Sequence, residues 1–393
     1  MNGTIYMPVG EVCSSISDTY REKKNMVTLI NTSDVLEGRV LNHERVPNSN
    51  LKGQFKKTFQ RDDILYSEIR PQNRRFAYVD FSPIDYIAST KLMVIRAKKD
   101  VVSPKYLYYF LKNSSTVAEL QLLAETRSGT FPQITFSEVA NLTIPVPSLA
   151  VQEVIVQTMQ CLEDKITCNE QINDNLEQQA QSYFQELFVD NADPEWAIGT
   201  ISDLGTVVGG STPSKAKPEY YTESGIAWIT PKDLSINKSK FVSHGENDIT
   251  ELGLRNSSAS LMPEGTVLFS SRAPIGYIAI AAGEVTTNQG FKSVVPKPEI
   301  GTPFVYFFLK NTLPVIEGMA SGSTFKEVSG STMKNVSAVI PDAETLAKFS
   351  DFCAPIFAQQ RILEEQNQSL ATLRDNLLPK LMSGEIDVSA VQL

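Results

Sequence analysis

The chain repeats itself over about half of its length. The segment SPKYLYYFLKN (Ser103–Asn113) returns as TPFVYFFLKN (Thr302–Asn311), and DILYSEIRP at 63–71 returns loosely as TVLFSSRAP at 266–274. Two weaker echoes link RSGTF at 127–131 with ASGSTF at 320–325, and residues 173–188 with residues 367–382. A long internal repeat indicates two copies of one structural unit, so the sequence predicts a pseudo-twofold internal repeat.

Each copy pairs a strand-rich segment with a long helical one. In the first copy, short β-branched or aromatic runs at 24–32, 76–79, 91–97 and 142–147 predict strands, and 103–113 and 136–142 predict short helices. In the second copy, the same reasoning predicts strands at 197–204, 225–231, 266–272, 277–283, 292–296 and 337–341. Mixed strands and short helices are typical of an α+β domain.

The helical segments are marked by a heptad pattern. Residues 151–188 contain no Gly or Pro, and apolar residues recur at alternating steps of three and four; a second such helix is expected over 344–381. Asn169 and Asn173 lie on the apolar stripe of the first helix. An Asn at such a position either controls the register of the paired helices or admits water where the middle of the pair is loosely packed. A lone amphipathic helix of this length needs an apolar partner, so we expect an antiparallel pair.

These patterns define the predicted fold class. It is α+β, with two tandem α/β domains separated by two long antiparallel helices that form a coiled-coil spacer. The expected domains are residues 1–147, the helix 148–190, residues 191–341, and the helix and tail 342–393. A two-headed molecule with pseudo-twofold symmetry suits a partner with its own approximate twofold, and duplex DNA is such a partner.

The charge distribution is compatible with nucleic acid despite a net charge of −9. The two helical segments carry −7 and −4, whereas residues 1–147 carry +4 and residues 191–341 carry −2. Phosphate binding requires a local basic face and not a basic total. The chain has no apolar run long enough to span a membrane, no signal-peptide pattern and no paired cysteines, so a cytoplasmic location is expected.

Motifs for catalysis are missing from the sequence. It has no GxGxxG, GxxxxGK[ST], HExxH or GxSxG motif, and no Asn- or Asp-Pro-Pro-aromatic tetrapeptide. The chain has two histidines, which leaves little general-base chemistry near neutral pH. We therefore expect no catalytic residues, no metal site and no cofactor on this chain. The turn at Gly209-Gly210 is not followed by a helix, and we expect it to bring backbone close to a phosphate.

Five stretches of the chain together resemble one family. They are LRDNLLPKLMSGEIDV at 373–388, GGSTPSKAKPEYY at 209–221, IAWITPKDLS at 226–235, LFSSRAPIG at 268–276 and TTNQGFK at 286–292. With them, the whole chain resembles the specificity subunit of type I restriction–modification systems. The first half matches in layout but not in detail, because VTLINTSDVLEG at 27–38 stands where the second half has AWITPKDL.

The resemblance implies a function, partners and cofactors. In such proteins two target-recognition domains each read one half of a split, asymmetric DNA site, and two helices set the spacing and dock two modification subunits, which restriction subunits join. S-adenosylmethionine, ATP and Mg²⁺ are then expected on the partner subunits. Two alternatives stay open on the residues alone: a stand-alone DNA methyltransferase or nuclease, and a coiled-coil scaffold with two protein-binding domains.

Polar and basic residues at turns are the candidates for DNA contact. Arg can donate two hydrogen bonds to guanine, and Asn and Gln can pair with adenine in the same manner. The candidates in the second domain are Ser211, Thr212, Lys215, Thr230, Lys232, Ser271, Arg272, Asn288, Gln289, Lys292, Ser323 and Lys326. The candidates in the first domain are Asn31, Ser33, Lys56, Lys57, Arg70, Arg74, Arg75, Lys91, Arg127, Thr130 and Gln133. The adjacent pairs Lys56-Lys57 and Arg74-Arg75 are predicted to clamp phosphates.

The C-terminal ends of both helices are unusually apolar. The candidates for partner binding are Tyr183, Phe184, Leu187, Phe188, Leu377, Leu378, Leu381 and Met382. Two interpretations stay open. These side chains either insert only into the adjacent globular domains, or also form two quasi-equivalent docking sites for a modification subunit.

Overall fold

A computed structural model describes residues 4–49, 53–126, 132–322 and 326–388. The chain divides into two compact units: unit 1 comprises Met1–Ile166 with Ser369–Leu393, and unit 2 comprises Thr167–Gln368. The two expected long helices are present as α5 (Leu149–Gln185) and α11 (Ala343–Ser383), and each contributes to both units. The units therefore do not coincide with the four expected domains. None of the helices within the described ranges combines the length and apolar character that crossing a membrane requires.

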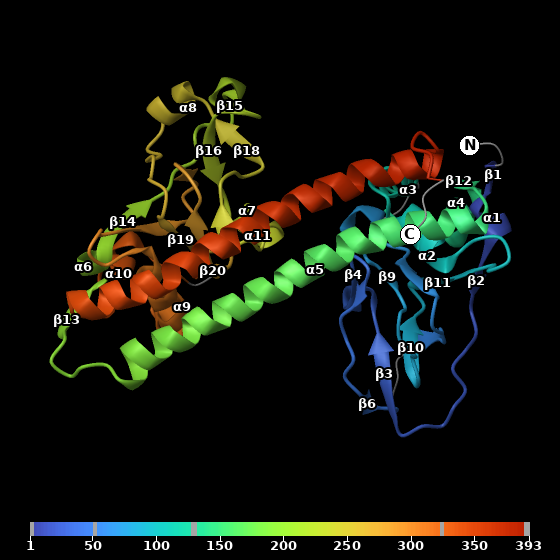
Figure 1. The fold of residues 1–393 in the computed structure, drawn as a ribbon, viewed down its shortest axis with the longest axis horizontal. Coiled ribbons are helices and arrows are strands. Elements are labelled where there is room, and N and C mark those ends of the chain that lie inside the picture. The colour runs from blue at the N-terminus through green and yellow to red at the C-terminus, as the bar shows by residue number, and fades with distance from the viewer. Residues whose placement is uncertain (1–3, 50–52, 127–131, 323–325, 389–393) are drawn as a thin grey trace. The chain divides into compact units, whose positions relative to one another are not determined.

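Unit 1 is built on two four-stranded sheets, with strand orders β2-β11-β8-β9 and β6-β3-β10-β7. The strands of the first sheet are β2 Cys13–Ile16, β11 Leu92–Ala97, β8 Ile64–Ser67 and β9 Phe76–Tyr78. Those of the second are β6 Val46–Pro47, β3 Met26–Ile30, β10 Tyr86–Ser89 and β7 Phe55–Lys57. Two short ribbons pair β1 (Ile5–Pro8) with β12 (Thr143–Val146), and β4 (Val35–Leu36) with β5 (Arg39–Val40). Figure 1 shows the sheet of β9 and β11 nearer to α5 than the sheet of β3, β6 and β10.

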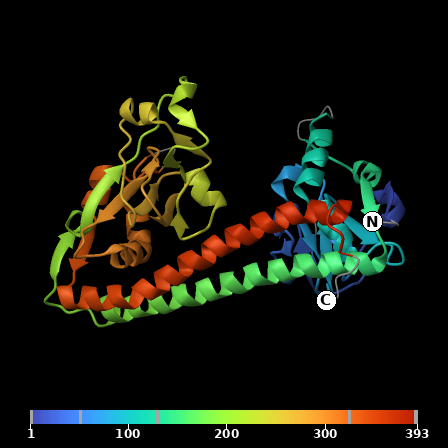
Figure 2. The ribbon, with the colours of Figure 1, turned by 45° about the horizontal axis from the view of Figure 1, so that its top comes forward.

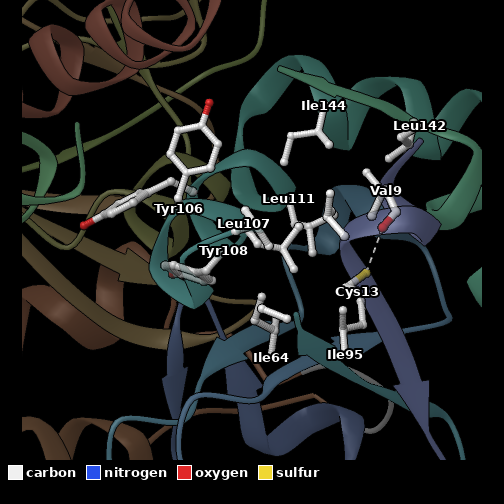
Figure 3. Close-up of a cluster of buried hydrophobic side chains, with 14 of the residues drawn as sticks. Val9, Cys13, Ile64, Ile95, Tyr106, Leu107, Tyr108, Leu111, Leu142 and Ile144 are labelled. Atoms are coloured by element: carbon white, nitrogen blue, oxygen red, sulfur yellow. Dashed lines mark hydrogen bonds between the residues drawn. The ribbon is translucent and has the colours of Figure 1, made fainter. Parts of the chain in front are cut away.

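The core of unit 1 lies between its first sheet and its short helices, which are α1 Val9–Val12, α2 Pro104–Lys112, α3 Ser114–Glu125 and α4 Phe136–Asn141. In Figure 3, Ile64 and Ile95 from the sheet point toward Leu107 and Leu111 of α2. The thiol of Cys13 donates a hydrogen bond to the main-chain oxygen of Val9 at 3.2 Å. The predicted strands 24–32, 76–79, 91–97 and 142–147, and the two predicted helices, are confirmed.

Unit 2 has a five-stranded sheet, β14-β22-β19-β20-β17, and a four-stranded sheet, β15-β18-β16-β21. The strands of the larger sheet are β14 Gly205–Gly209, β22 Lys292–Pro296, β19 Val267–Ser271, β20 Ile275–Ala281 and β17 Phe241–Val242. Those of the smaller sheet are β15 Tyr221–Thr222, β18 Asn247–Ile249, β16 Ile226–Ile229 and β21 Thr286–Thr287. A ribbon pairs β13 (Ala197–Thr200) with β23 (Ser337–Ile340). The short helices are α6 Ile201–Leu204, α7 Pro231–Ile236, α8 Glu251–Arg255, α9 Thr302–Gly318 and α10 Gly330–Lys334; Figure 2 shows α9 between the sheets and the long helices.

One predicted strand of unit 2 is half wrong. Residues 197–204 were expected to be a single strand, but the strand ends at Thr200 and the next four residues form α6. The carboxylate of Asp203 accepts hydrogen bonds from the main-chain N–H of Thr200 at 2.8 Å and from its hydroxyl at 3.0 Å. This capping box supplies partners for the orphan donors of a helix start, so it turns the chain out of the strand.

The internal repeat extends to single backbone pairs. β3 runs parallel to β10 in unit 1, and β16 runs parallel to β21 in unit 2. Arg70 and Ala273 follow equivalent strands, and both have a left-handed backbone, with φ of 46° and 53°. Beside them, an isolated bridge joins Ile69 to Gln133 in unit 1 and Arg272 to Glu327 in unit 2. Equivalent positions therefore carry different side chains on one backbone frame.

The long helices run antiparallel. In unit 2, Asn169 of α5 donates a hydrogen bond to Asn367 of α11 at 2.8 Å, and the rings of Tyr183 and Phe352 lie 4.5 Å apart. Residue numbers thus rise along α5 as they fall along α11. Asn169 is fully buried and bonds directly across the pair, which is the arrangement that register control requires.

The apolar helix ends are buried in the globular cores. Phe184 and Phe188 of unit 2 lie among the side chains of α9 and α11, and Leu378, Leu381 and Met382 lie in the core of unit 1. Tyr183, Leu187 and Leu377 are half-buried against the same cores. The structure therefore favours insertion into the adjacent globular cores for these five buried residues. The expectation that they offer an accessible docking surface is corrected. Partner binding by the other three stays a prediction.

Candidate nucleic-acid interface

Unit 2 contains a polar cleft of about 480 Å³ that gathers many of the predicted DNA-contacting residues. It is lined by Thr212, Lys215, Trp228, Thr230, Pro231, Lys232, Asp233, Glu246, Asn247, Arg272, Ala273, Asn288, Gln289 and Gly290. The parallel pairing of β16 and β21 explains part of this convergence, because the carboxyl ends of both strands lie at one edge. The main-chain N–H of Asn288, just after β21, donates to the oxygen of Ile229 at 3.0 Å.

Asp233 holds one wall of the cleft. Its carboxylate accepts hydrogen bonds from the main-chain N–H of Thr230 at 2.7 Å and from the Thr230 hydroxyl at 2.6 Å, and so caps α7. Its second oxygen accepts from the main-chain N–H of Glu246 at 2.8 Å. A buried carboxylate thus fixes the positions of Thr230, Lys232 and Glu246, and Lys232 and Glu246 form an exposed ion pair at 2.5 Å.

The Gly209-Gly210 turn precedes Thr212 and Lys215, which line the cleft. A Cβ atom on Gly210 would lie 2.0 Å from the main-chain oxygen of Asn288, so glycine is required by the approach to the loop after β21. Ser211 donates its N–H to Thr287 at 2.8 Å, and the Thr212 hydroxyl donates to the side-chain oxygen of Gln289. Contact packing explains why glycine stands at position 210, and the approach of this turn to a phosphate stays a prediction.

Most candidates in unit 2 lie in the cleft or at its edge. Ser211 lies beneath it and accepts a hydrogen bond from the Trp228 indole at 3.0 Å, and Lys292 forms an ion pair with Glu327 at 3.6 Å. Ser271 is wrong as a DNA contact, because it is fully buried and its hydroxyl donates to the main-chain oxygen of Gly290 at 3.1 Å. Lys326 is exposed, and Ser323 lies outside the described residues.

The corresponding face of unit 1 keeps the frame but brings together fewer candidates. Asn31 and Asp34 form a capping box that corresponds to that of Thr230 and Asp233, so Asn31 and the exposed Ser33 occupy the equivalent position in the fold. Arg70 and Gln133 lie at the equivalent bridge, and Lys91 forms an ion pair with Glu68 at 3.6 Å. Arg127 and Thr130 lie outside the described residues.

Three of the four residues in the predicted phosphate clamps have hydrogen-bond partners within the protein. The ammonium of Lys57 donates to the main-chain oxygens of Thr90 at 3.1 Å and Leu92 at 2.8 Å, and burial lowers its pKa; only its neighbour Lys56 is exposed. The guanidinium of Arg75 donates to the main-chain oxygen of Ser33 at 2.9 Å.

The side chain of Arg74 lies in a different part of unit 1 from that of Arg75. It donates to the hydroxyl of Ser114 at 2.9 Å and lines a separate pocket with Lys112 and Arg374. The two members of each pair thus have different surroundings, and their contact with phosphates stays a prediction.

Sequence reasoning missed three residues that line the cleft, Asp233, Glu246 and Asn247, and also Glu327, which forms an ion pair with Arg272. The pattern Thr-Pro-Lys-Asp at 230–233 is a capping-box signature and could have identified Asp233. Nothing in the sequence signals that Glu246 and Glu327 face the basic residues of the cleft. Trp228 is buried and also lines the cleft.

Comparison with known proteins identifies the family. Residues 6–178 and 194–373 each match the family described as the type I restriction modification DNA specificity domain, and the chain belongs to this family. The two matches confirm both the resemblance and the tandem repeat.

Individual relatives match this chain over most of its length or over about half of it. The chain is 29% identical to the type I restriction enzyme HindI specificity subunit of Haemophilus influenzae, over 92% of this chain and 94% of the relative. It is 38% identical to the MjaIX specificity subunit of Methanocaldococcus jannaschii, over 47% of this chain and 45% of the relative. A crystal structure of a type I restriction-modification S subunit from M. genitalium has the same fold, with a TM-score of 0.53 at 16% identity, covering 97% of this chain and 96% of that one.

Proposed function

We propose that this chain is the DNA sequence-specificity subunit of a type I restriction–modification complex, and that it is not itself catalytic. The observation that carries the proposal is the cleft of unit 2, where Thr212, Lys215, Thr230, Lys232, Arg272, Asn288 and Gln289 converge on a frame that unit 1 repeats. Amide and guanidinium groups read base edges, and lysines neutralise phosphates. The family membership of both halves supports the same assignment.

The two units are proposed to read different half-sites. Unit 1 has Asn31, Thr32 and Ser33 after β3, at the position where unit 2 has Thr230, Pro231 and Lys232 after β16. Because base readout depends on the side chains that a common frame presents, unequal side chains predict an asymmetric, two-part target.

The helices are proposed to set the gap between half-sites and to carry the partners. α5 and α11 each contribute to both units, and an α-helix is stiff, with a rise of about 1.5 Å per residue. Two modification subunits with adenine methyltransferase activity would bind the chain, and restriction subunits would join them. S-adenosylmethionine, ATP and Mg²⁺ would bind those partners and not this chain, and the complex would act in the cytoplasm.

A comparison of methylated adenines in the source genome, with and without this gene, tests the proposal. We expect the gene to be required for methylation at one asymmetric site made of two short sequences and a fixed gap. A palindromic site, or an unchanged pattern of methylation in the strain that lacks the gene, would contradict the proposal.

A binding experiment distinguishes the proposed non-catalytic subunit from a stand-alone DNA methyltransferase. Isolated full-length chain is incubated with radioactive S-adenosylmethionine and exposed to ultraviolet light. We expect no labelling of this chain. Labelling of the chain that competes with unlabelled S-adenosylmethionine would favour a stand-alone methyltransferase.

A further inference from the structure

Arg272 stands out among the basic residues of the cleft in unit 2. It directly follows β19, and it is the one arginine among the described residues that line this cleft. Its side chain is 36% exposed, so its guanidinium can reach a ligand. Lys215 and Lys232 also line the cleft, but an ammonium group lacks the planar fork of donors that a guanidinium offers.

The backbone of Arg272 is fixed from both sides. The preceding residue, Ser271, is fully buried and donates its N–H to the oxygen of Gly290 at 2.7 Å. On the other side, Arg272 forms an isolated antiparallel bridge with Glu327, and the N–H of Val328 donates to the oxygen of Ser271 at 3.0 Å. The base of the arginine side chain therefore has a defined position relative to the cleft.

The carboxylate of Glu327 also restrains the side chain. One oxygen lies 3.5 Å from a terminal nitrogen of Arg272, and the other lies 3.6 Å from the ammonium of Lys292. Lys292 is largely buried and lies within 3.4 Å of the main-chain oxygen of Gln289, so it anchors the carboxylate from below. An ion pair as exposed as that of Arg272 and Glu327 stabilises a fold little, so its main effect is on the orientation of the guanidinium.

We propose that Arg272 reads a guanine in the half-site bound by unit 2, and that Glu327 is a positioning residue that orients the guanidinium for this contact. The guanidinium would donate two hydrogen bonds, to O6 and N7 of the base, which is the contact that its fork geometry fits. This inference rests on the proposed function and specifies one base of the target.

Unit 1 has no counterpart of the Arg272–Glu327 pair at the equivalent bridge. Its bridge joins Ile69 to Gln133, and the N–H of Ile134 donates to the oxygen of Glu68 at 2.9 Å, as Val328 does to Ser271 in unit 2. The backbone is thus the same, but an apolar residue replaces the arginine and an amide replaces the carboxylate. The guanine contact is accordingly specific to the half-site read by unit 2.

The test is a selection of random duplex DNA by the full-length chain and by three variants. Arg272→Lys keeps the charge and removes the fork, and Glu327→Gln keeps the shape and removes the negative charge. Glu246→Gln is the matched control, because it makes the same change on the carboxylate that pairs with Lys232 in the same cleft.

We expect Arg272→Lys to lower the preference for guanine at one position by roughly 5- to 150-fold and to leave the other positions unchanged. Glu327→Gln should lower the preference at that same position by roughly 2- to 10-fold, through the lost restraint on a long side chain. Both carboxylate variants should bind unselected DNA more tightly, because each loses a negative charge that faces phosphates, but Glu246→Gln should keep the guanine preference.

The outcomes separate this inference from the proposed function. If the wild-type chain enriches no sequence, the proposed function fails, and the inference fails with it. If the wild type enriches a two-part site and Arg272→Lys keeps every base preference, or loses affinity equally for all sequences, then Arg272 is a phosphate contact and only the inference is overturned. A Glu327→Gln variant that behaves like Glu246→Gln would remove the positioning role.

Discussion

Phe184→Ala tests whether the end of α5 belongs to the core of unit 2. Phe184 is 2% exposed, and its ring lies 5.2 Å from Phe188, 5.8 Å from Phe304 and 5.8 Å from Phe349. A buried Phe→Ala change costs about 3–5 kcal/mol through lost burial and the cavity that remains. The surrounding aromatic rings are large and mutually packed and cannot collapse into the space, so we expect about 4 kcal/mol.

Urea unfolding followed by tryptophan fluorescence measures this cost. Both tryptophans of the chain, Trp196 and Trp228, lie in unit 2, so the signal reports this unit. With a slope of about 2 kcal/mol per molar urea, the midpoint should fall by roughly 2 M. Phe352→Ala is the control: Phe352 is 39% exposed on α11, and its loss should shift the midpoint by well under 1 M. Equal small shifts in both variants, with loss of partner binding only in Phe184→Ala, would refute the core assignment and restore the docking site.

Three further predictions concern the cleft and the helices. Asp233→Ala should lower the free energy of unfolding by about 1–3 kcal/mol and weaken DNA binding, because it removes the cap of α7 and the hydrogen-bond acceptor of the Glu246 N–H. Asp203→Ala removes a similar cap at α6 and should leave the affinity for duplex DNA unchanged in a fluorescence titration; equal losses of affinity in the two variants would contradict this. The ammonium of Lys240 is buried and lies 2.7 Å from the carboxylate of Glu177, and burial lowers its pKa from 10.5 to about 8. Between these pH values the unfolded chain binds a proton that the folded chain has released, so the stability of the wild type should rise with pH relative to Lys240→Met in urea unfolding at pH 7.5 and 9.5; parallel curves would show that folding does not lower this pKa. Insertion of one heptad after Asn169, with a matching insertion in α11, should lengthen the pair by about 10 Å and widen the gap in the methylated site by about three base pairs, and an unchanged gap would show that the helices do not set it.

The sequence predicted the parts of the fold that depend on local pattern. The heptads of α5 and α11, the helix that begins at Pro104 and the strand that ends at Ala97 all follow from periodicity, proline position and β-branched runs. The start of α6 was missed because a four-residue helix is too short for periodicity and depends on the capping box of Thr200 and Asp203.

The sequence predicted which turns carry the candidate residues, but not which of these turns meet in the folded chain. Thr230 and Asn288 meet because β16 and β21 pair in parallel, and one sequence does not specify which strands pair. The hydrogen bonds of Lys57 and Arg75 could not be predicted, because their acceptors are main-chain oxygens contributed by distant segments. The apolar stripe of α5 likewise indicated that Phe184 needs a partner surface, but not that α9 and α11 of the same chain supply it.

Exchange of residues 191–341 for the corresponding segment of a relative with a different target tests the central claim most directly. The measurement is the map of methylated adenines in cells that carry the chimaera together with the modification subunits of the source strain. If each unit reads its own half-site, one half of the target should change, and the other half should remain as it is for the parent chain. A change in both halves, or in neither, would contradict modular readout by two repeated units.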